Sequence, residues 1–186
     1  MAKKKVALLL ADGFEEVEAM TPIDFLRRAG IEVTVLGVDT DQPTGGHGVT
    51  VKTDGRVENP PRELDGVVIP GGMPGATNVA DSEAAQALIS ELYEADKLIA
   101  AICAAPAMVL HPLGILDGRK ATCYPGFEKE LTQAEFTEER VVHSGTVITS
   151  RGPGTAAEFS AAVIEYLLDA ESARKVVSAT LQPFSA

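Results

Sequence analysis

The feature that most constrains the fold is a recurring pattern in which a short apolar run is followed by a turn and then by a helical stretch. The runs are apolar along most of their length, as in strands that a parallel sheet buries on both faces: residues 6–11, 31–38, 67–69 and 98–102. Helical patterns follow three of them, at about residues 15–29, 82–95 and 104–110. This alternation predicts an α/β fold, a flavodoxin-like, doubly wound parallel sheet sandwich.

The remaining segments are less regular. They suggest a short edge strand at 49–53, a strand at 120–122, a short helix at 127–131, a hairpin across 141–149, and helices at 155–168 and 171–181. The chain has 186 residues and contains no internal repeat or linker. We therefore expect a single domain over residues 1–186.

Charge and cysteine content exclude several classes of protein. The net charge of −11 at pH 7 argues against stable binding to nucleic acid. No apolar run is long enough to cross a bilayer, and the acidic residues after the first strand do not suit a signal peptide. Two cysteines give neither a disulfide framework nor zinc-ligand spacing. We expect a cytoplasmic protein with no membrane partner and no metal site.

Cys103 lies at the junction between the apolar run 98–102 and the helical stretch 104–110. Open α/β sheets place their sites at such strand ends, and a helix N-terminus favours an anion, which predicts a lowered thiol pKa. The stretch therefore looks like a nucleophile elbow that carries sulfur in place of oxygen. The alternative is that Cys103 is a small buried hydrophobe, as most free cysteines are.

Two other strand ends are expected to meet Cys103 in the same crevice. Glu18 follows the first strand and is the best carboxyl partner, because a protonated carboxyl can donate to a thiolate. Gly71 and Gly72 follow the third strand, where glycines let backbone N–H groups form an oxyanion site. Glu15 and its neighbour at position 16 are expected to be solvated in the first helical turn.

No histidine has a position that pairs it with Cys103. His47 lies in a polar, glycine-rich loop, His111 follows the helix after Cys103 by two turns, and His143 lies on the predicted hairpin. Each is predicted to be structural or solvated, so Cys103 would depend on the helix dipole and on Glu18. A loose dinucleotide-binding pattern begins at Gly152, but no strand and acidic ribose ligand follow it, so we interpret it as a chance match.

The chain contains six motifs whose order and spacing are specific to one family: Asp12-Gly-Phe-Glu-Glu-Val-Glu18, Thr21-Pro-Ile-Asp24, Arg27-Arg-Ala-Gly30, Pro70-Gly-Gly72, Ala101-Ile-Cys-Ala-Ala-Pro106 and Arg151-Gly-Pro-Gly-Thr155. Through them the chain resembles the DJ-1/ThiJ/PfpI superfamily along nearly its whole length. The resemblance is closest to the DJ-1 and YajL branch.

The resemblance implies a flavodoxin-like homodimer with a strained, oxidisable cysteine. It implies that Cys103 is the reactive cysteine, that Glu18 is its protonated partner, and that the amides of Gly72 and Ala104 face the sulfur. Supporting candidates are Glu15, Gly71 and Tyr124. Tyr124 stands where this branch often has a histidine, so a proton shuttle through that histidine is absent. Ala104, directly after Cys103, does not match the histidine of the protease-like branch.

The functions credited to the superfamily give two hypotheses that share these residues. One is a cofactor-independent glyoxalase III-type lyase or deglycase hydrolase, which acts on methylglyoxal, glyoxal or their early adducts through a cysteine hemithioacetal. The other is a redox-sensing, stress-protective protein or holdase chaperone, in which Cys103 is oxidised to the sulfinate with little turnover. A structural dimer with an inert thiol is a third interpretation. Cys123 is either a packing residue or a resolving thiol.

Overall fold

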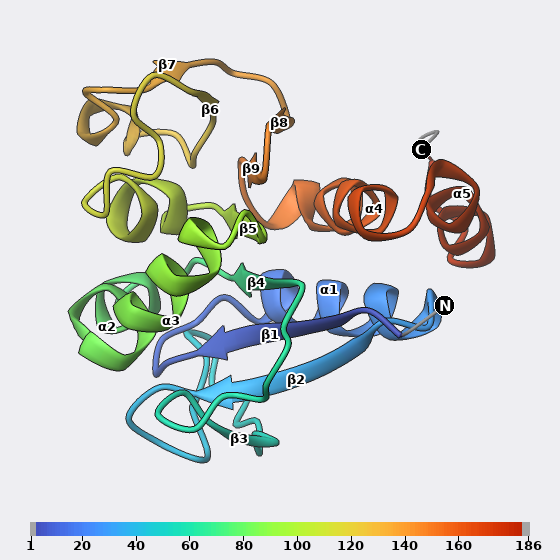
Figure 1. Ribbon diagram of the computed structural model, residues 1–186, viewed down its shortest axis with the longest axis horizontal. Helices are drawn as coiled ribbons and strands as arrows, with labels where there is room; N and C mark the ends of the chain where they lie inside the picture. The colour runs from blue at the N-terminus through green and yellow to red at the C-terminus, as the bar shows by residue number, and fades with distance from the viewer. Residues whose placement is uncertain (1–2, 184–186) are drawn as a thin grey trace.

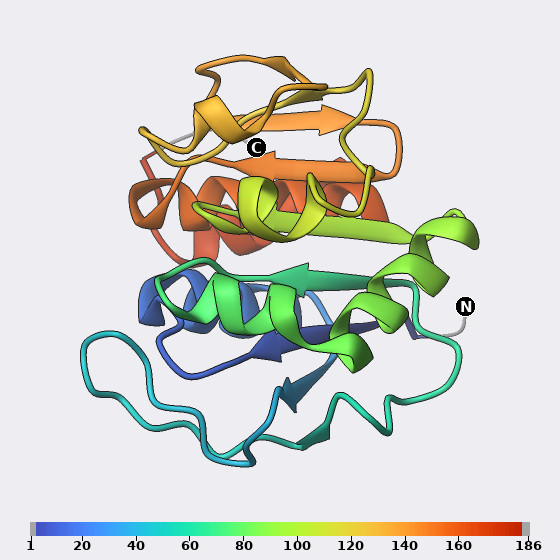
Figure 2. The same ribbon diagram turned by 90° about the vertical axis from the view of Figure 1, so that its left-hand side faces the viewer.

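The computed structural model describes residues 3–183, whose main sheet lies between two layers of helices (Figure 1). The strands of this sheet are β1 (Lys5–Leu10), β2 (Glu32–Gly37), β3 (Gly55–Arg56), β4 (Gly66–Ile69), β5 (Leu98–Ile102), β8 (Val141–Ser144) and β9 (Val147–Ser150). They lie side by side in the order β3-β2-β1-β4-β5-β9-β8, which Figure 2 shows from the blue strands at the bottom to the orange hairpin at the top. All neighbours are parallel except β8 and β9. The predicted α/β fold is confirmed.

The strand order contains one reversal that matters for function. The chain starts at β1, adds β2 and β3 on one side, and then returns to add β4 and β5 on the other side of β1. Loops on the two sides of such a reversal leave the sheet in opposite directions, which opens a crevice at the carboxyl ends of the strands. This crevice lies between the ends of β1 and β4.

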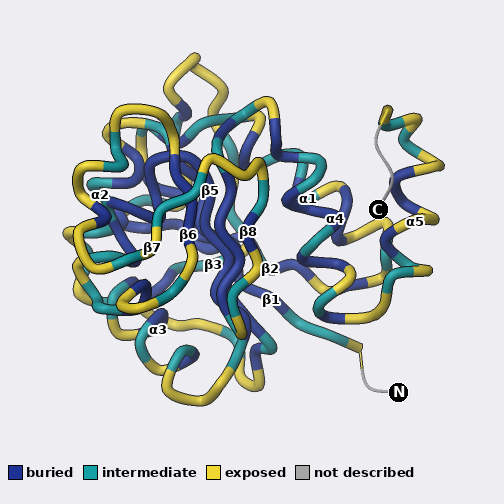
Figure 3. Tube along the Cα trace, turned by 90° about the horizontal axis from the view of Figure 1, so that it is seen from above, coloured by how far each residue is buried: buried dark blue, intermediate teal, exposed yellow. Residues whose placement is uncertain are grey.

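Two helical layers cover the sheet, and Figure 3 shows the buried strands between them. One layer contains α1 (Glu16–Arg28), α4 (Ala156–Leu167) and α5 (Ala170–Ala179), and the other contains α2 (Gly75–Asp81), α3 (Glu83–Glu94) and the π-helical turn η1 (Pro106–Leu110). Along β1, Ala7 and Leu9 pack in one hydrophobic cluster, whereas Leu8 and Leu10 pack in the other. Because both faces are buried, the strand is apolar from Val6 to Leu10.

Smaller elements lie beyond β5. Strands β6 (Lys120–Ala121) and β7 (Glu135–Phe136) form a separate two-stranded sheet, and 3₁₀ turns η2 (Glu128–Glu130) and η3 (Pro153–Thr155) lie in the connections. The predicted hairpin is confirmed as β8–β9, with Gly145 at a positive φ in its turn. Across residues 3–183, no helix is both long enough and apolar enough to span a membrane.

One local prediction is wrong, one helix was not predicted, and one predicted helix differs in type. Residues 49–53 form no strand in the described chain, because Thr50 makes only an isolated bridge to Thr44 and the edge of the sheet is β3 instead. Residues 75–81 form helix α2, which their weak helical propensity hides; burial of Ala76 and Val79 stabilises it. The helix expected at 104–110 is present as η1 at Pro106–Leu110, but it is a π-helix and begins two residues later.

Candidate active site

Cys103 occupies a sharp turn between β5 and η1. Its φ is +65°, a left-handed conformation that costs a non-glycine residue roughly 1–2 kcal/mol. Two hydrogen bonds hold this turn: the Cys103 N–H donates to the Ser150 carbonyl, and the Cys103 carbonyl accepts from the Tyr124 N–H, each at 2.9 Å. The side chain, 9% exposed, is therefore fixed at the carboxyl edge of the sheet.

Glu18 comes from the first turns of α1 and lies beside Cys103 with no exposed surface. Its Oε2 accepts a hydrogen bond from the Gly71 N–H at 2.8 Å, and its Oε1 is buried without a hydrogen-bond partner among residues 3–183. Burial, helped by the nearby charge of Glu15, raises the pKa of Glu18 to about 7, although interactions with Gly71 and the Cys103 thiol oppose the shift. Near neutral pH this carboxyl can both give and take a proton.

The predicted lowering of the thiol pKa is wrong for this environment. Burial raises the pKa of the Cys103 thiol, and the adjacent Glu18 carboxylate adds to the shift through its charge and its hydrogen bond. The backbone amides of Gly72 and Ala104 interact with the sulfur and act in the opposite direction. The short turn η1 supplies too little dipole to outweigh burial and a neighbouring carboxylate, so the thiol keeps its proton beside Glu18.

The loop after β4 fills the space between these groups with backbone. A Cβ added at Gly71 would lie 2.6 Å from the Cys103 Cβ and 2.9 Å from Glu18 Oε2. Gly72 has a φ of +88°, and a Cβ there would collide with the backbone of Glu15 and Gly13. The Glu15 N–H also donates to the Gly71 carbonyl at 3.0 Å, which joins the start of α1 to this loop. A side chain at either glycine would therefore force these closely packed segments apart.

Tyr124 and Gly152 add a further wall that the sequence analysis placed only in part. Tyr124 is 44% exposed, and its ring lies against Gly152, where an added Cβ would be 2.9 Å from the ring. The same added Cβ would be 3.9 Å from Glu18 Oε1, so Gly152 separates the ring from the buried carboxyl. From the sequence, Gly152 belongs to a family motif and to a chance dinucleotide-binding match, and neither placed it beside Glu18. The parallel pairing of β9 with β5, had it been predicted, would have placed this loop at the site.

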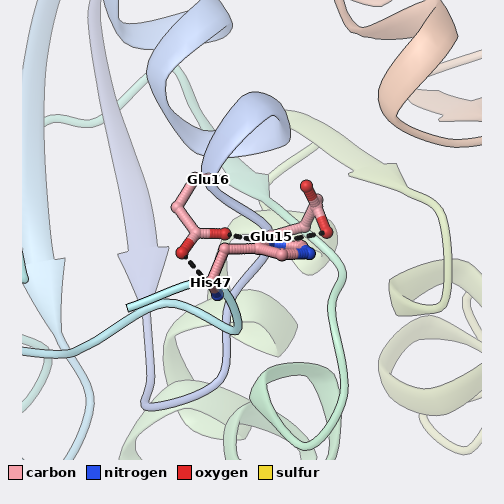
Figure 4. A group of neighbouring side chains, drawn as sticks. All are labelled: Glu15, Glu16 and His47. Atoms are coloured by element: carbon pink, nitrogen blue, oxygen red, sulfur yellow. Dashed lines mark hydrogen bonds and ion pairs between the residues drawn. The ribbon is translucent and has the colours of Figure 1, made fainter. Parts of the chain in front are cut away.

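Glu15 and Glu16 are not the solvated residues that we expected. Their side chains are 18% and 12% exposed, and both face the ring of His47 (Figure 4). Burial opposes ionisation of Glu16, but hydrogen bonds from the His47 ring and from backbone N–H groups prevail and lower its pKa to about 2. The loop that carries His47 therefore closes over the start of α1.

The other candidate groups lie in different surroundings. Cys103 and Cys123 are both free thiols; Cys123 has no exposed surface, and burial raises its pKa to about 11. His111 and His143 use a ring nitrogen to contact Thr132 and the Gly145 carbonyl, respectively. Full burial favours the packing role for Cys123 over a resolving role.

Comparisons with known proteins show which family and fold this chain is similar to. The DJ-1/PfpI family profile matches residues 4–166. The chain is 39% identical to the Parkinson disease protein 7 homolog of Danio rerio over 183 residues, which cover 95% of this chain and 96% of that one. It is 35% identical to Deglycase PH1704 of Pyrococcus horikoshii, with 80% of this chain and 90% of that one covered. The oxidized structure of Toxoplasma gondii DJ-1 superimposes with a TM-score of 0.93 at 42% identity, covering 97% of this chain and all of that one.

Proposed function

The chain belongs to the DJ-1/PfpI family, and we propose that it is a cofactor-independent glyoxalase or deglycase that acts on small 2-oxoaldehydes or their early adducts. The observation that carries this proposal is the fully buried Glu18 carboxyl beside the Cys103 thiol. A name of one relative, Deglycase PH1704, is consistent with it. We also propose that the protein is a homodimer.

The first step uses the proton of the Cys103 thiol and the Glu18 carboxylate beside it. As the sulfur attacks the aldehyde carbon of methylglyoxal, ionised Glu18 accepts the thiol proton and the carbonyl oxygen becomes an alkoxide. The amides of Gly72 and Ala104, which interact with the sulfur, are suited to donate hydrogen bonds to that oxygen. Transfer of the proton from Glu18 to the oxygen gives a neutral hemithioacetal and restores the carboxylate.

The second stage moves hydrogen between the two carbons. Glu18 takes the proton from the hemithioacetal carbon and gives it to the neighbouring carbonyl oxygen, which forms an enediol. Glu18 then takes the proton from the hydroxyl on the first carbon and gives it to the second carbon, which leaves a lactyl thioester. Water then hydrolyses the thioester to lactate and the free thiol. The net reaction adds one water to methylglyoxal, so it consumes neither oxidant nor cofactor.

The decisive experiment measures lactate directly, because loss of aldehyde can reflect simple trapping by a thiol. We expect wild type to form lactate in large molar excess over protein, and Cys103→Ser and Glu18→Gln to lose that activity. Glu94→Gln, an exposed carboxylate at the end of α3, serves as the matched control and should keep it. Lactate that never exceeds the amount of protein would contradict turnover.

A second candidate function uses the same residues for oxidation of Cys103. One peroxide converts the thiol to the sulfenic acid and a second converts that to the sulfinic acid, each with release of water. The solved relative described as oxidized favours this possibility, and amides that interact with the sulfur suit a sulfinate. If lactate turnover fails, mass spectrometry after peroxide treatment should find two added oxygens on Cys103 and not on the buried Cys123.

A further inference from the structure

Glu15, Glu16 and His47 direct three potential metal ligands toward one another at the start of α1 (Figure 4). His47 Nδ1 lies 2.8 Å from Glu16 Oε2 and 3.8 Å from Glu15 Oε2. All three ligand atoms lie within 4.8 Å of one another. Since His47 is 31 residues from Glu16 in the chain, ligand spacing in the sequence gave no sign of this group.

The fold holds these ligands in place before any ion binds. Glu16 Oε1 accepts hydrogen bonds from the backbone N–H groups of His47 at 2.7 Å and Val49 at 3.4 Å, which leaves Oε2 facing the imidazole. The loop itself is held by a hydrogen bond from the Gly46 N–H to the Phe14 carbonyl. The arrangement is therefore preorganised by backbone contacts that do not use the ligand atoms.

A proton does not satisfy all three groups. A proton on Nδ1 can be donated to Glu16 at 2.8 Å, but 3.8 Å to Glu15 is too far for a hydrogen bond. The Glu15 carboxylate is 18% exposed and meets the His47 ring only at this longer distance. One imidazole thus faces two carboxylates and can neutralise only one of them by hydrogen bonding.

A divalent cation can bond to both carboxylates and the imidazole at once. Zinc binds nitrogen and carboxylate oxygen at about 2.0–2.2 Å, so ligand atoms on a tetrahedral ion lie about 3.4 Å apart. This separation falls between the two distances from His47 Nδ1 to the carboxylates. His47 is 73% exposed, which leaves room for water as a fourth ligand.

We propose that His47, Glu15 and Glu16 form a binding site for a zinc-type divalent cation at the rim of the candidate active site. The imidazole distinguishes this site from an acidic surface patch, because nitrogen ligands favour zinc over magnesium or calcium. The site does not use Cys103, and its existence does not depend on the proposed function.

The test is isothermal titration calorimetry with zinc chloride and untagged Cys103→Ser protein. This parent variant lacks the Cys103 thiol, which could otherwise bind zinc in competition with the proposed site. We expect one zinc ion per chain, and a loss of affinity of about tenfold or more in His47→Gln and in Glu15→Gln. His143→Gln is the matched control and should bind as the parent does. Cobalt should give the intense visible bands of a four-coordinate ion in the parent, and these bands should be lost in His47→Gln.

Three results would overturn the proposal: no zinc binding by the Cys103→Ser parent, unchanged affinity in His47→Gln, or calcium binding as tight as zinc binding. Melting temperatures measured without metal show whether each variant is folded. Glu16→Gln is not decisive, because Glu16 also holds the loop. Glu15→Gln and His47→Gln leave its backbone hydrogen bonds intact.

Discussion

Replacing Gly71 by alanine tests whether the close approach of Glu18 to Cys103 determines the rate. The added Cβ would lie 2.6 Å from the Cys103 Cβ, whereas ordinary contact begins at 3.4 Å, so the two must separate by about 0.8 Å. Glu18 Oε2 and the Ala104 nitrogen, each 2.9 Å from the new atom, must also move. Gly71 does not have a positive φ, so the effect arises from the added atom and not from the backbone conformation.

The size of the effect follows from the displacement. A misplacement of about 1 Å between reacting groups can reduce a rate by about 100-fold, or about 3 kcal/mol of barrier. Overpacking of this kind lowers the free energy of unfolding by roughly 1–3 kcal/mol. We therefore expect Gly71→Ala to be folded, with a lower melting temperature, and to form lactate from methylglyoxal about 100-fold more slowly than wild type.

The matched control is Gly154→Ala, because a Cβ there meets no atom within 4 Å and Gly154 does not have a positive φ. Gly154→Ala should keep the wild-type rate of lactate formation and the wild-type melting temperature. The reasoning is refuted if Gly71→Ala is destabilised yet keeps a rate within about threefold of wild type. It is equally refuted if Gly154→Ala loses as much activity as Gly71→Ala.

Four further predictions concern the protonation of Glu18, its effect on stability, the wall of the site and assembly. Because ionised Glu18 must accept the thiol proton and its pKa is about 7, the rate of lactate formation should rise as pH increases through about 7. The pKa of Glu18 in the folded protein lies above the usual 4.5, so its contribution to stability is complete below about pH 4.5 and is lost as pH rises through about 7. At pH 8 the free energy of unfolding of Glu18→Gln should therefore be about 3 kcal/mol higher than that of wild type. Gly152→Ala, whose Cβ would push the Tyr124 ring aside, should raise KM for methylglyoxal severalfold with little change in melting temperature, because a ring can move more easily than backbone. Light scattering should give twice the 19.5 kDa chain mass for the proposed homodimer.

Each of these has an outcome that contradicts it. A wild-type rate that is flat between pH 5 and 8 would show that Glu18 does not accept the proton in the limiting step. An equal free energy of unfolding for Glu18→Gln and wild type at pH 8 would mean that burial does not raise the pKa of the Glu18 carboxyl. An unchanged KM in Gly152→Ala would remove Tyr124 from the substrate path, and a mass of one chain at micromolar concentration would exclude a stable dimer.

The order of elements was largely readable from the sequence because buried parallel strands leave a strong pattern. The runs at β1 and β5 are apolar on both faces, and the turn after each contains residues suited to a site. The elements that were missed are those whose sequence carries little local information. Helix α2 has glycine, threonine and asparagine in its first turns, and β3 is only two residues long.

For the candidate site, the sequence alone selected the chemical groups: a cysteine after β5, a glutamate after β1 and two glycines after β4. Strand-end position was enough, because the carboxyl ends of neighbouring parallel strands meet at one edge. Tertiary structure alone decided how these groups behave. The shift of the Glu18 pKa, the raised thiol pKa, the ring of Tyr124 on Gly152 and the meeting of His47 with Glu15 and Glu16 depend on burial and on contacts between distant segments. Local sequence patterns encode neither the burial of a group nor its contacts with distant segments, since both arise only when the chain is packed.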